Sequence, residues 1–336
     1  MTHVPVLRDA ACGVLEPRDG GVYIDGTFGG GGYTRALLDM ADTIVVAIDR
    51  DPDAVAEGQD LAAQYGARLH LVRGRFADMA ALAEAAGYDR IDGIVLDLGV
   101  SSMQFDRAGR GFAFSQDGPL DMRMGQEGVS ADTLLNRADP DLLARIIAVY
   151  GEEKRARAIA RAIVAHRHGG ELTRTGQLAD VVCGVVRRAA DGVHPATRTF
   201  QALRIYLNDE LGELLRALQA AEKLLRPEGR LAVVTFHSLE DRMVKRFFAR
   251  RTGRAGRVSR HIPPRATLPP SFAELPATTL PRRGRTPDDA EIAANPRARS
   301  ARLRAAARTH AAPIDDIDGL MPRRAPHLAD FRKGAA

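Results

Sequence analysis

The sequence is poor in residues that cross-link a chain or bind metals. Its 336 residues include two cysteines, no tryptophan and only 5% aromatic residues. Cys12 and Cys183 lie far apart and form no Cys-x-x-Cys pair, which argues against a zinc ribbon or a disulfide framework and favours a reducing compartment. His166 and His168 lack ligand spacing with any cysteine or acidic cluster, so we expect no metal.

Long apolar runs are also missing. No apolar stretch approaches 18 residues, and the N-terminus, Met-Thr-His-Val-Pro, has no basic segment followed by an apolar one. We therefore expect a soluble, cytoplasmic protein without a membrane partner.

Charge is not lacking, but it is unevenly distributed. The formal net charge is +5, yet the segment from Arg242 to His310 has 17 Lys and Arg against 4 Asp and Glu. The other 267 residues have 31 against 39. A basic segment on a mildly acidic body predicts a polyanionic partner, with RNA or DNA ahead of a membrane. The alternative is an arginine-rich tail that is only solvated.

Short apolar runs alternate with helical patterns over the first hundred residues and again after residue 207. The strands are predicted at 22–25, 43–49, 69–72, 91–97 and 231–236. Such alternation predicts an α/β fold with a doubly wound, mainly parallel sheet.

Between these two regions the alternation stops. A long Gly-rich, polar loop is predicted at 98–128, followed by helices. We expect one discontinuous domain formed by 1–105 and 210–310, an inserted helical subdomain at 106–209 for substrate recognition, and a tail at 311–336.

The stretch from Val22 to Tyr33 is a strand, a loop with four consecutive glycines, and the start of a helix. This unit brings backbone close to a nucleotide-like ligand. Asp49 ends the second strand, 20 residues past Gly29, where an acidic side chain can bind two ribose hydroxyls. Both nicotinamide dehydrogenases and S-adenosylmethionine (SAM) methyltransferases share that geometry.

The order of the loop favours SAM over a nicotinamide dinucleotide. The loop has the form Asp25-x-Thr27-x-Gly29-x-Gly31, with Thr27 where methyltransferases usually have their first glycine. Asp97, after the fourth strand, is a candidate to bind the SAM ammonium or to accept a proton-bearing amine, or else it only caps a turn. Phe76, after the third strand, is a candidate to pack on adenine, or else it is ordinary core.

Several long motifs resemble the ribosomal RNA small-subunit methyltransferase H family, also called MraW, and the match runs from His3 to about Arg304. The motifs are Asp97-Leu-Gly-Val-Ser-Ser102 with Gln104 and Asp106, Arg110-Gly-Phe-Ala-Phe114, Asp117-Gly-Pro-Leu-Asp-Met-Arg-Met124, Tyr150-Gly-Glu-Glu, His194-Pro-Ala-Thr-Arg-Thr-Phe-Gln-Ala-Leu-Arg-Ile205, Phe236-His-Ser-Leu-Glu-Asp-Arg242 and Asn295-Pro-Arg-Ala-Arg-Ser-Ala-Arg-Leu-Arg304.

The resemblance implies a class I, Rossmann-like SAM methyltransferase of the bacterial cytoplasm, which methylates N4 of a cytidine in the decoding centre of 16S rRNA in the small ribosomal subunit. The SAM-binding positions that it implies are Gly31, Gly32, Tyr33, Asp49, Phe76, Asp97 and Gln104. The sequence departs from the family pattern twice, since Tyr33 replaces the usual His and Met103 the usual Pro. Tyrosine keeps an aromatic face and a donor, so we expect SAM binding to survive.

Cytosine N4 is a poor nucleophile, so an acceptor for its amino hydrogens is needed, and Asp97 is the candidate. The usual Pro-Pro-aromatic run is absent after Asp97, so an aromatic must come from elsewhere, and Phe105, Phe112 and Phe114 are the candidates. We expect the 98–128 loop and the segment from His194 to Arg198 to close over an extruded base.

Each of these assignments has a plainer alternative. The tentative catalytic residues are Asp97 and His194, and the tentative substrate residues are Phe112, Phe114, Asp117 and Arg198. His194 and Asp117 could instead order turns, and Arg198 could form a structural ion pair.

Two other functions stay open at this point. One is a non-catalytic RNA-binding or assembly factor on a degenerate methyltransferase fold, and the other is a nicotinamide-dependent oxidoreductase. The intact glycine loop, with Asp49 and Asp97, argues against the first. The sequence leaves the oligomeric state open between monomer and homodimer, and it does not tell free rRNA from an assembled 30S particle.

Overall fold

The computed structural model describes residues 5–188, 192–254 and 268–334. The chain divides into two compact units. The first unit comprises 1–99 and 212–320, and the second comprises 100–211 and 321–336. His3, which begins the family resemblance, and residues 255–267 of the basic segment lie outside the described residues.

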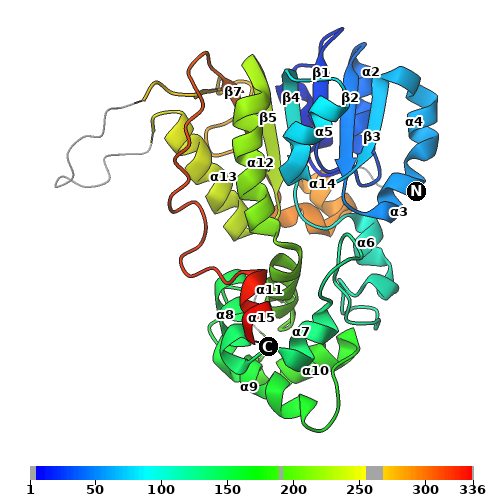
Figure 1. Ribbon diagram of the computed structural model, residues 1–336, viewed down its shortest axis with the longest axis vertical. Coiled ribbons are helices and arrows are strands. Elements are labelled where there is room, and N and C mark those ends of the chain that lie inside the picture. The colour runs from blue at the N-terminus through cyan, green and yellow to red at the C-terminus, as the bar shows by residue number, and fades with distance from the viewer. Residues whose placement is uncertain (1–4, 189–191, 255–267, 335–336) are drawn as a thin grey trace, which may run out of the picture. The chain divides into compact units, whose positions relative to one another are not determined.

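Strands alternate with helices through the first unit, as Figure 1 shows. The strands are β1 (Val22–Asp25), β2 (Ile44–Asp49), β3 (Leu69–Arg73), β4 (Ile91–Asp97), β5 (Leu225–Thr235), β6 (Phe272–Glu274) and β7 (Arg302–Arg308). The helices of this part of the chain are α1 (Arg8–Leu15), α2 (Gly32–Met40), α3 (Pro52–Glu57), α4 (Gln59–Tyr65), α5 (Met79–Ala85), α12 (Glu210–Leu224), α13 (Ser238–Arg251) and α14 (Asp289–Ala294).

The sheet has the order β3-β2-β1-β4-β5-β7-β6. Strands β1 to β5 are parallel, while β7 runs antiparallel to both β5 and β6. The five predicted strands and the mainly parallel α/β fold are therefore confirmed. Because the strands are parallel, the carboxyl ends of β1, β2 and β4 meet at one edge of the sheet.

Continuous apolar strands bury both faces of the sheet. On one face, alternate residues such as Val45, Ala47 and Val95 join Leu15 of α1 and Leu37 of α2 in one core cluster. Helix α13 packs against β5, β6 and β7. This core holds the strand ends rigidly in place.

Two strands escaped the sequence analysis. Strand β7 lies in the arginine-rich segment, where Arg302 and Arg304 alternate with Leu303 and alanines. Its partner β5 is about 70 residues away in the sequence, so no local sequence pattern indicates that the two strands pair. Strand β6 lies in the Pro- and Arg-rich segment 252–285 and pairs with β7.

Local geometry marks the ends of several elements. His237 occupies the N-cap position of α13, where its side chain accepts from the N–H of Glu240. Helix α10 (Thr175–Val185) begins after Arg174, which occupies its N-cap position. Residues 227–229 lie inside β5, where Glu228 has φ 70° and the pairing with β4 shifts register.

The second unit is helical. Besides α10, its helices are α6 (Ser102–Asp106), α7 (Ala131–Arg137), α8 (Pro140–Tyr150), α9 (Ala156–Arg167), α11 (Thr197–Asn208) and α15 (Leu328–Gly334). Helix α8 packs against α9 and α11. The hydroxyl of Tyr150 donates to the carbonyl of Pro326, and that of Tyr206 to His327, which fastens the last residues to this unit. Across the part of the chain that is described, no helix is long and apolar enough to cross a bilayer.

Candidate active site

Three acidic side chains end three neighbouring parallel strands of the first unit. Asp25 ends β1, Asp49 ends β2 and Asp97 ends β4. The order of the sheet places β1 between β2 and β4, so the three carboxyls share the carboxyl edge of the sheet. In α/β sheets this edge is where ligands bind.

Asp25 is fully buried and holds the glycine loop. Its Oδ1 accepts from the backbone N–H of Thr27 (3.1 Å), and its Oδ2 accepts from the N–H (3.1 Å) and hydroxyl (2.7 Å) of Thr34. Burial raises the pKa of this carboxyl from 3.8 to about 6, although these hydrogen bonds oppose the shift. The bonds to Thr27 and Thr34 fix both ends of the loop.

Asp49 is oriented by backbone donors. Its Oδ2 accepts from the N–H of Gly29 and its Oδ1 from the N–H of Asp51, both at 2.8 Å. Burial raises its pKa, against these two bonds. Each carboxylate oxygen has a second lone pair, so the oriented group keeps acceptor capacity for ribose hydroxyls.

Asp97 carries the least satisfied carboxyl of the three. Its backbone N–H donates to the hydroxyl oxygen of Thr27 at 2.7 Å, which ties β4 to the loop after β1. Asp97 as a whole is half-buried, but its Oδ1 is inaccessible to solvent and has no hydrogen-bond partner among the described residues. Burial, then the nearby carboxyls of Asp25 and Glu240, raises its pKa well above the ordinary value.

The four glycines of the loop play different parts. A Cβ on Gly31 would lie 2.7 Å from Leu61 and 2.9 Å from Phe28, and one on Gly32 would lie 2.2 Å from Pro5. Gly30 is exposed and has nothing within 4 Å of such a Cβ. Gly31 and Gly32 therefore permit packing of the loop on the protein, and Gly30 is its open position.

Tyr33 lies in the first turn of α2 with its side chain in the core. It is 2% exposed, and its hydroxyl donates to the backbone carbonyl of Val6. Burial raises its pKa well above 10. The donor that we expected to serve SAM thus has a protein acceptor, and a contact of Tyr33 with the cofactor stays a prediction.

Phe76 stands next to the glycine loop. It follows β3 and is half-buried, and a Cβ on Gly26 would lie 3.2 Å from its own Cβ and 2.5 Å from Leu96. Glycine at position 26 is what lets the segment after β3 approach the end of β1. That position suits a ring that covers a flat ligand beside Asp49.

His237 and Glu240 close the end of β5. They form a capping box at the start of α13, and His237 Nε2 lies 3.0 Å from Glu240 Oε1. Glu240 Oε2 also accepts from the N–H groups of Phe236 and His237. These contacts give the pair a structural role in the turn after β5.

In the second unit, His194 and Phe114 form an aromatic stack. Their ring centroids are 4.4 Å apart with an interplanar angle of 27°, and Phe200 meets Phe114 edge-on at 5.0 Å. The N–H of Ala196 donates to His194 Nδ1, and Cys183 Sγ lies 3.9 Å from Nε2. One face of Phe114 is therefore covered by an imidazole that is itself fixed.

The other predicted residues of this unit occupy structural positions. Phe112 is buried, and the carboxylate of Asp117 accepts from the N–H of Gly176 at the start of α10 and pairs with Arg174. Arg198 is exposed, with its Nη1 3.8 Å from Glu153. Gln104 is buried and forms a capping box with Ser101 at the start of α6. Substrate or cofactor roles for these residues stay predictions.

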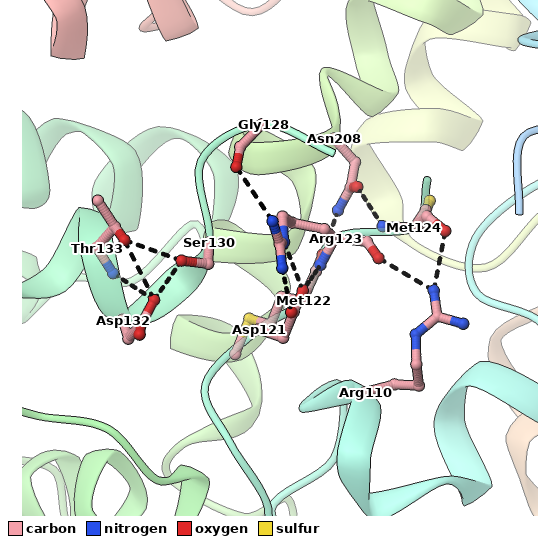
Figure 2. Close-up of polar contacts among 10 residues, drawn as sticks. All are labelled: Arg110, Asp121, Met122, Arg123, Met124, Gly128, Ser130, Asp132, Thr133 and Asn208. Carbon is pink, nitrogen blue, oxygen red and sulfur yellow. Dashed lines mark hydrogen bonds and ion pairs between the residues drawn. The ribbon is translucent and has the colours of Figure 1, made fainter. Parts of the chain in front are cut away.

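Side chains around Asp121 hold the backbone of residues 121–124 in place through hydrogen bonds, as Figure 2 shows. Asp121 binds the guanidinium of Arg123 through both carboxylate oxygens. Arg110 donates to the carbonyls of Arg123 and Met124. Asn208 of α11 accepts from the N–H of Met124 and donates to the carbonyl of Met122. The resemblance located this motif, but only the structure gives it a role.

Sequence reasoning missed two site residues, Thr27 and Thr34. Both hydroxyls bind groups at strand ends, Asp97 and Asp25 respectively. Thr27 could have been predicted from the sequence, because it stands where methyltransferases usually have glycine. A polar side chain at a position that is usually glycine indicates a hydrogen-bond partner nearby.

The strand ends together form an acidic site beside a backbone loop. Three carboxyls with raised pKa values favour a ligand that brings positive charge, because a cation stabilises their ionised forms. They disfavour a pyrophosphate, which would add negative charge to a buried acidic edge. The site therefore favours a ligand that carries positive charge.

Comparisons with known proteins agree with this chemistry. The sequence model of the MraW methylase family matches residues 1–309. The chain is 59% identical over 317 residues to "Ribosomal RNA small subunit methyltransferase H" of Parvibaculum lavamentivorans, covering 94% of this chain and 92% of that protein. It is 55% identical over 332 residues to the protein of the same name from Nitrobacter winogradskyi, covering 99% and 98%.

Proposed function

The chain belongs to the MraW methylase family, and from that premise we propose that it transfers a methyl group from SAM to N4 of a cytidine in 16S rRNA. The observation that carries the proposal is the buried Oδ1 of Asp97 at the carboxyl edge of the sheet, for which the described part of the chain offers no hydrogen-bond partner. A buried carboxylate oxygen without a donor is costly, so a ligand that brings N–H groups to it is strongly favoured.

SAM fits the residues at this edge. It is a cation with a ribose and an adenine, and it supplies, when bound, an activated methyl group on a sulfonium. Asp49 offers acceptors to the ribose hydroxyls, Phe76 covers the adenine, and the open backbone at Gly30 admits the methionine chain. Asp25 stays within the protein and keeps the loop in place.

Asp97 is also the group best suited to the acceptor amine. The lone pair of cytosine N4 is delocalised into the ring, so a carboxylate that accepts an amino hydrogen makes this nitrogen a better nucleophile. The raised pKa of Asp97 makes it a stronger base than an ordinary aspartate, able to hold the proton that N4 releases. The rigid β4 and the bond from Thr27 fix its orientation.

The second unit supplies the recognition of the base. We propose that the unit formed by 100–211 and 321–336 binds the rRNA, and that the exposed side of the Phe114 and His194 stack offers an aromatic face to an RNA base. Stacking of this kind contributes about 1–3 kcal/mol per base, which offsets the few kcal/mol needed to extrude a base. The reaction takes place in the cytoplasm, where small subunits are assembled.

Mass spectrometry of 16S rRNA nucleosides from cells with and without the gene tests the substrate. N4-methylcytidine should disappear with the gene and return when the gene is restored on a plasmid. An unchanged level in the deletion strain would refute the assignment. Restoration by the Asp97→Ala variant would instead favour a non-catalytic assembly factor.

A direct binding comparison tests the cofactor. Calorimetric titration with SAM and with NAD should give binding of SAM only, and Asp49→Ala should weaken it because the ribose acceptor is lost. Tight binding of NAD without SAM would establish an oxidoreductase and end the methyltransferase proposal.

A further inference from the structure

The antiparallel side of the sheet in the first unit holds a basic groove that the proposed chemistry does not use. The cavity has a volume of about 340 Å³ and lies between α13, the segment after β6, and β7. Its apolar floor includes Phe248, Leu275, Leu280 and Ala305. We define the basic groove by its charged rim, which is Lys245, Arg254, Glu274, Arg282, Arg283 and Arg302.

The rim has an excess of four positive charges. Its single carboxylate, Glu274, pairs with both Arg254 and Arg282 and so fixes two guanidinium groups side by side. Lys245 and Arg283 are exposed, and no carboxylate of the described residues lies within ion-pair distance of either. Five cations around a single carboxylate repel one another unless a further anion lies among them.

Other arginines of the same segment do not belong to this surface. Arg304 is nearly buried and is held by both oxygens of Asp241, while Arg251 and Arg308 are buried and bonded within the protein. The basic segment thus contains two kinds of cation. Some are bonded within the protein and stabilise the fold, and others face solvent and are available to bind a partner. Only the second kind can bind a partner.

The groove begins near the proposed reaction centre. Arg302 pairs with Thr235 at the carboxyl end of β5, and Asp97 pairs with Val234 of the same strand. The backbones of β7 and β4 are separated by two strand spacings, roughly 10 Å. An RNA strand that leaves the site can therefore reach the groove.

We infer that the basic groove binds the phosphodiester backbone of the rRNA that flanks the target cytidine. This inference rests on the proposed function. Guanidinium groups match phosphate oxygens in charge and geometry. Contacts to phosphates position the RNA strand but do not read its sequence. Such contacts suit a groove next to the reaction centre, because the reaction centre itself selects the base.

The test removes the two available cations. Lys245→Ala combined with Arg283→Ala should weaken binding to a 16S rRNA transcript by at least about tenfold at moderate salt, and should lower the slope of log affinity against log salt by about two. SAM affinity and thermal stability should not change, because neither side chain touches the cofactor edge or the core.

A matched control separates the groove from net charge. Arg90 and Lys223 are exposed near the amino ends of β4 and β5, at the opposite edge of the sheet, so Arg90→Ala with Lys223→Ala removes the same charge. This variant should bind the transcript almost as the wild type does. Equal affinities and equal salt slopes for the two double variants would overturn the inference.

The same experiment distinguishes other failures. If the groove variant binds free 16S rRNA normally but binds 30S subunits weakly, the groove contacts a ribosomal protein and the RNA-backbone inference is wrong. If the wild type methylates neither probe, the proposed function fails, whatever the groove variants bind.

Discussion

The hydroxyl of Thr27 accepts a 2.7 Å hydrogen bond from the backbone N–H of Asp97. This bond joins the glycine loop after β1 to the end of β4, two segments 70 residues apart. It orients the residue whose Oδ1 has no partner among the described residues. A methyltransferase loop with threonine in a glycine slot thereby gains a positioning contact.

Thr27→Val should show what the hydrogen bond to Asp97 contributes apart from the packing of the side chain. Valine keeps the shape of threonine but leaves the N–H of Asp97 without an acceptor, which costs about 1–3 kcal/mol of stability. We expect a lower kcat with a smaller effect on the KM for RNA, measured by transfer of radiolabelled methyl groups to 30S subunits. Thr27→Ser, which retains the hydroxyl, should recover most of the rate, and a Ser variant as slow as the Val variant would contradict the positioning role.

Asp97→Asn should lower turnover and increase the free energy of unfolding. Replacing this buried carboxyl, whose Oδ1 has no partner among the described residues, with a neutral amide should increase the free energy of unfolding by about 1 kcal/mol in the absence of ligand. Turnover should fall at least about a hundredfold, because general-base contributions are of that size. Urea unfolding and methyl transfer measure the two effects, and wild-type turnover would remove Asp97 from the site.

The buried Asp25 predicts a pH dependence of stability. Its pKa is raised from 3.8 to about 6, so between these values the folded protein retains a proton that the unfolded chain has released. The contribution of Asp25 to the free energy of unfolding is therefore present below about pH 4 and is lost as the pH rises to about 6, by up to about 3 kcal/mol. Urea unfolding of wild type and Asp25→Asn from pH 4 to 7 measures it as a difference. A difference that does not change with pH would show that the carboxyl does not titrate in this window.

The buried pair of Glu222 and Arg251 should dominate the stability of the basic segment. Glu222 Oε2 accepts from Arg251 Nε at 2.9 Å, and both side chains are almost fully buried. Glu222→Gln leaves the guanidinium uncompensated and should lower the free energy of unfolding by about 3–5 kcal/mol. Lys223→Ala breaks only an exposed pair with Asp315 and should change it by less than about 1 kcal/mol. Similar losses in both variants would mean that burial does not set the strength of the first pair.

Asn208 should control the order of the loop at 107–130. Asn208→Leu removes the bonds to the backbone of Met122 and Met124 at a buried position. Limited proteolysis should cut this loop faster in the variant. The increase should be roughly tenfold if the free energy of opening the loop falls by about 1.4 kcal/mol, the contribution of one hydrogen bond. Thr133→Ala, which removes a half-buried hydroxyl bonded to Ser130 and Asp132 in the same region but not to Met122 or Met124, is the control (Figure 2). Equal cleavage rates would show that the loop is held elsewhere.

Much of the fold followed from local patterns in the sequence. The apolar runs before Asp25, Asp49 and Asp97 marked three parallel strands and left an acid at the end of each. Asp51 caps α3 with Pro52 at the first helical position, a local signal that needs only the immediate neighbours of the capping side chain. Residue spacing along one segment is enough to decide such features.

Other features depended on partners far away in the chain. The hydroxyl of Tyr33 binds Val6, β7 pairs with β5, and Arg251 and Arg308 are buried around Glu222. A sequence counts these arginines as surface charge, because nothing local reveals a carboxylate 29 residues earlier in the chain.

The sequence by itself therefore determined the family, the parallel strands and the acids at their ends. Tertiary structure alone decided which of those acids is satisfied, which glycine is open and which arginines face solvent. The physical reason is that hydrogen bonds and burial are properties of pairs brought together by packing. Asp25 and Asp97 are the same residue type at equivalent strand ends, yet the hydroxyl of Thr34 binds the carboxylate of one, while Thr27 binds only the backbone of the other.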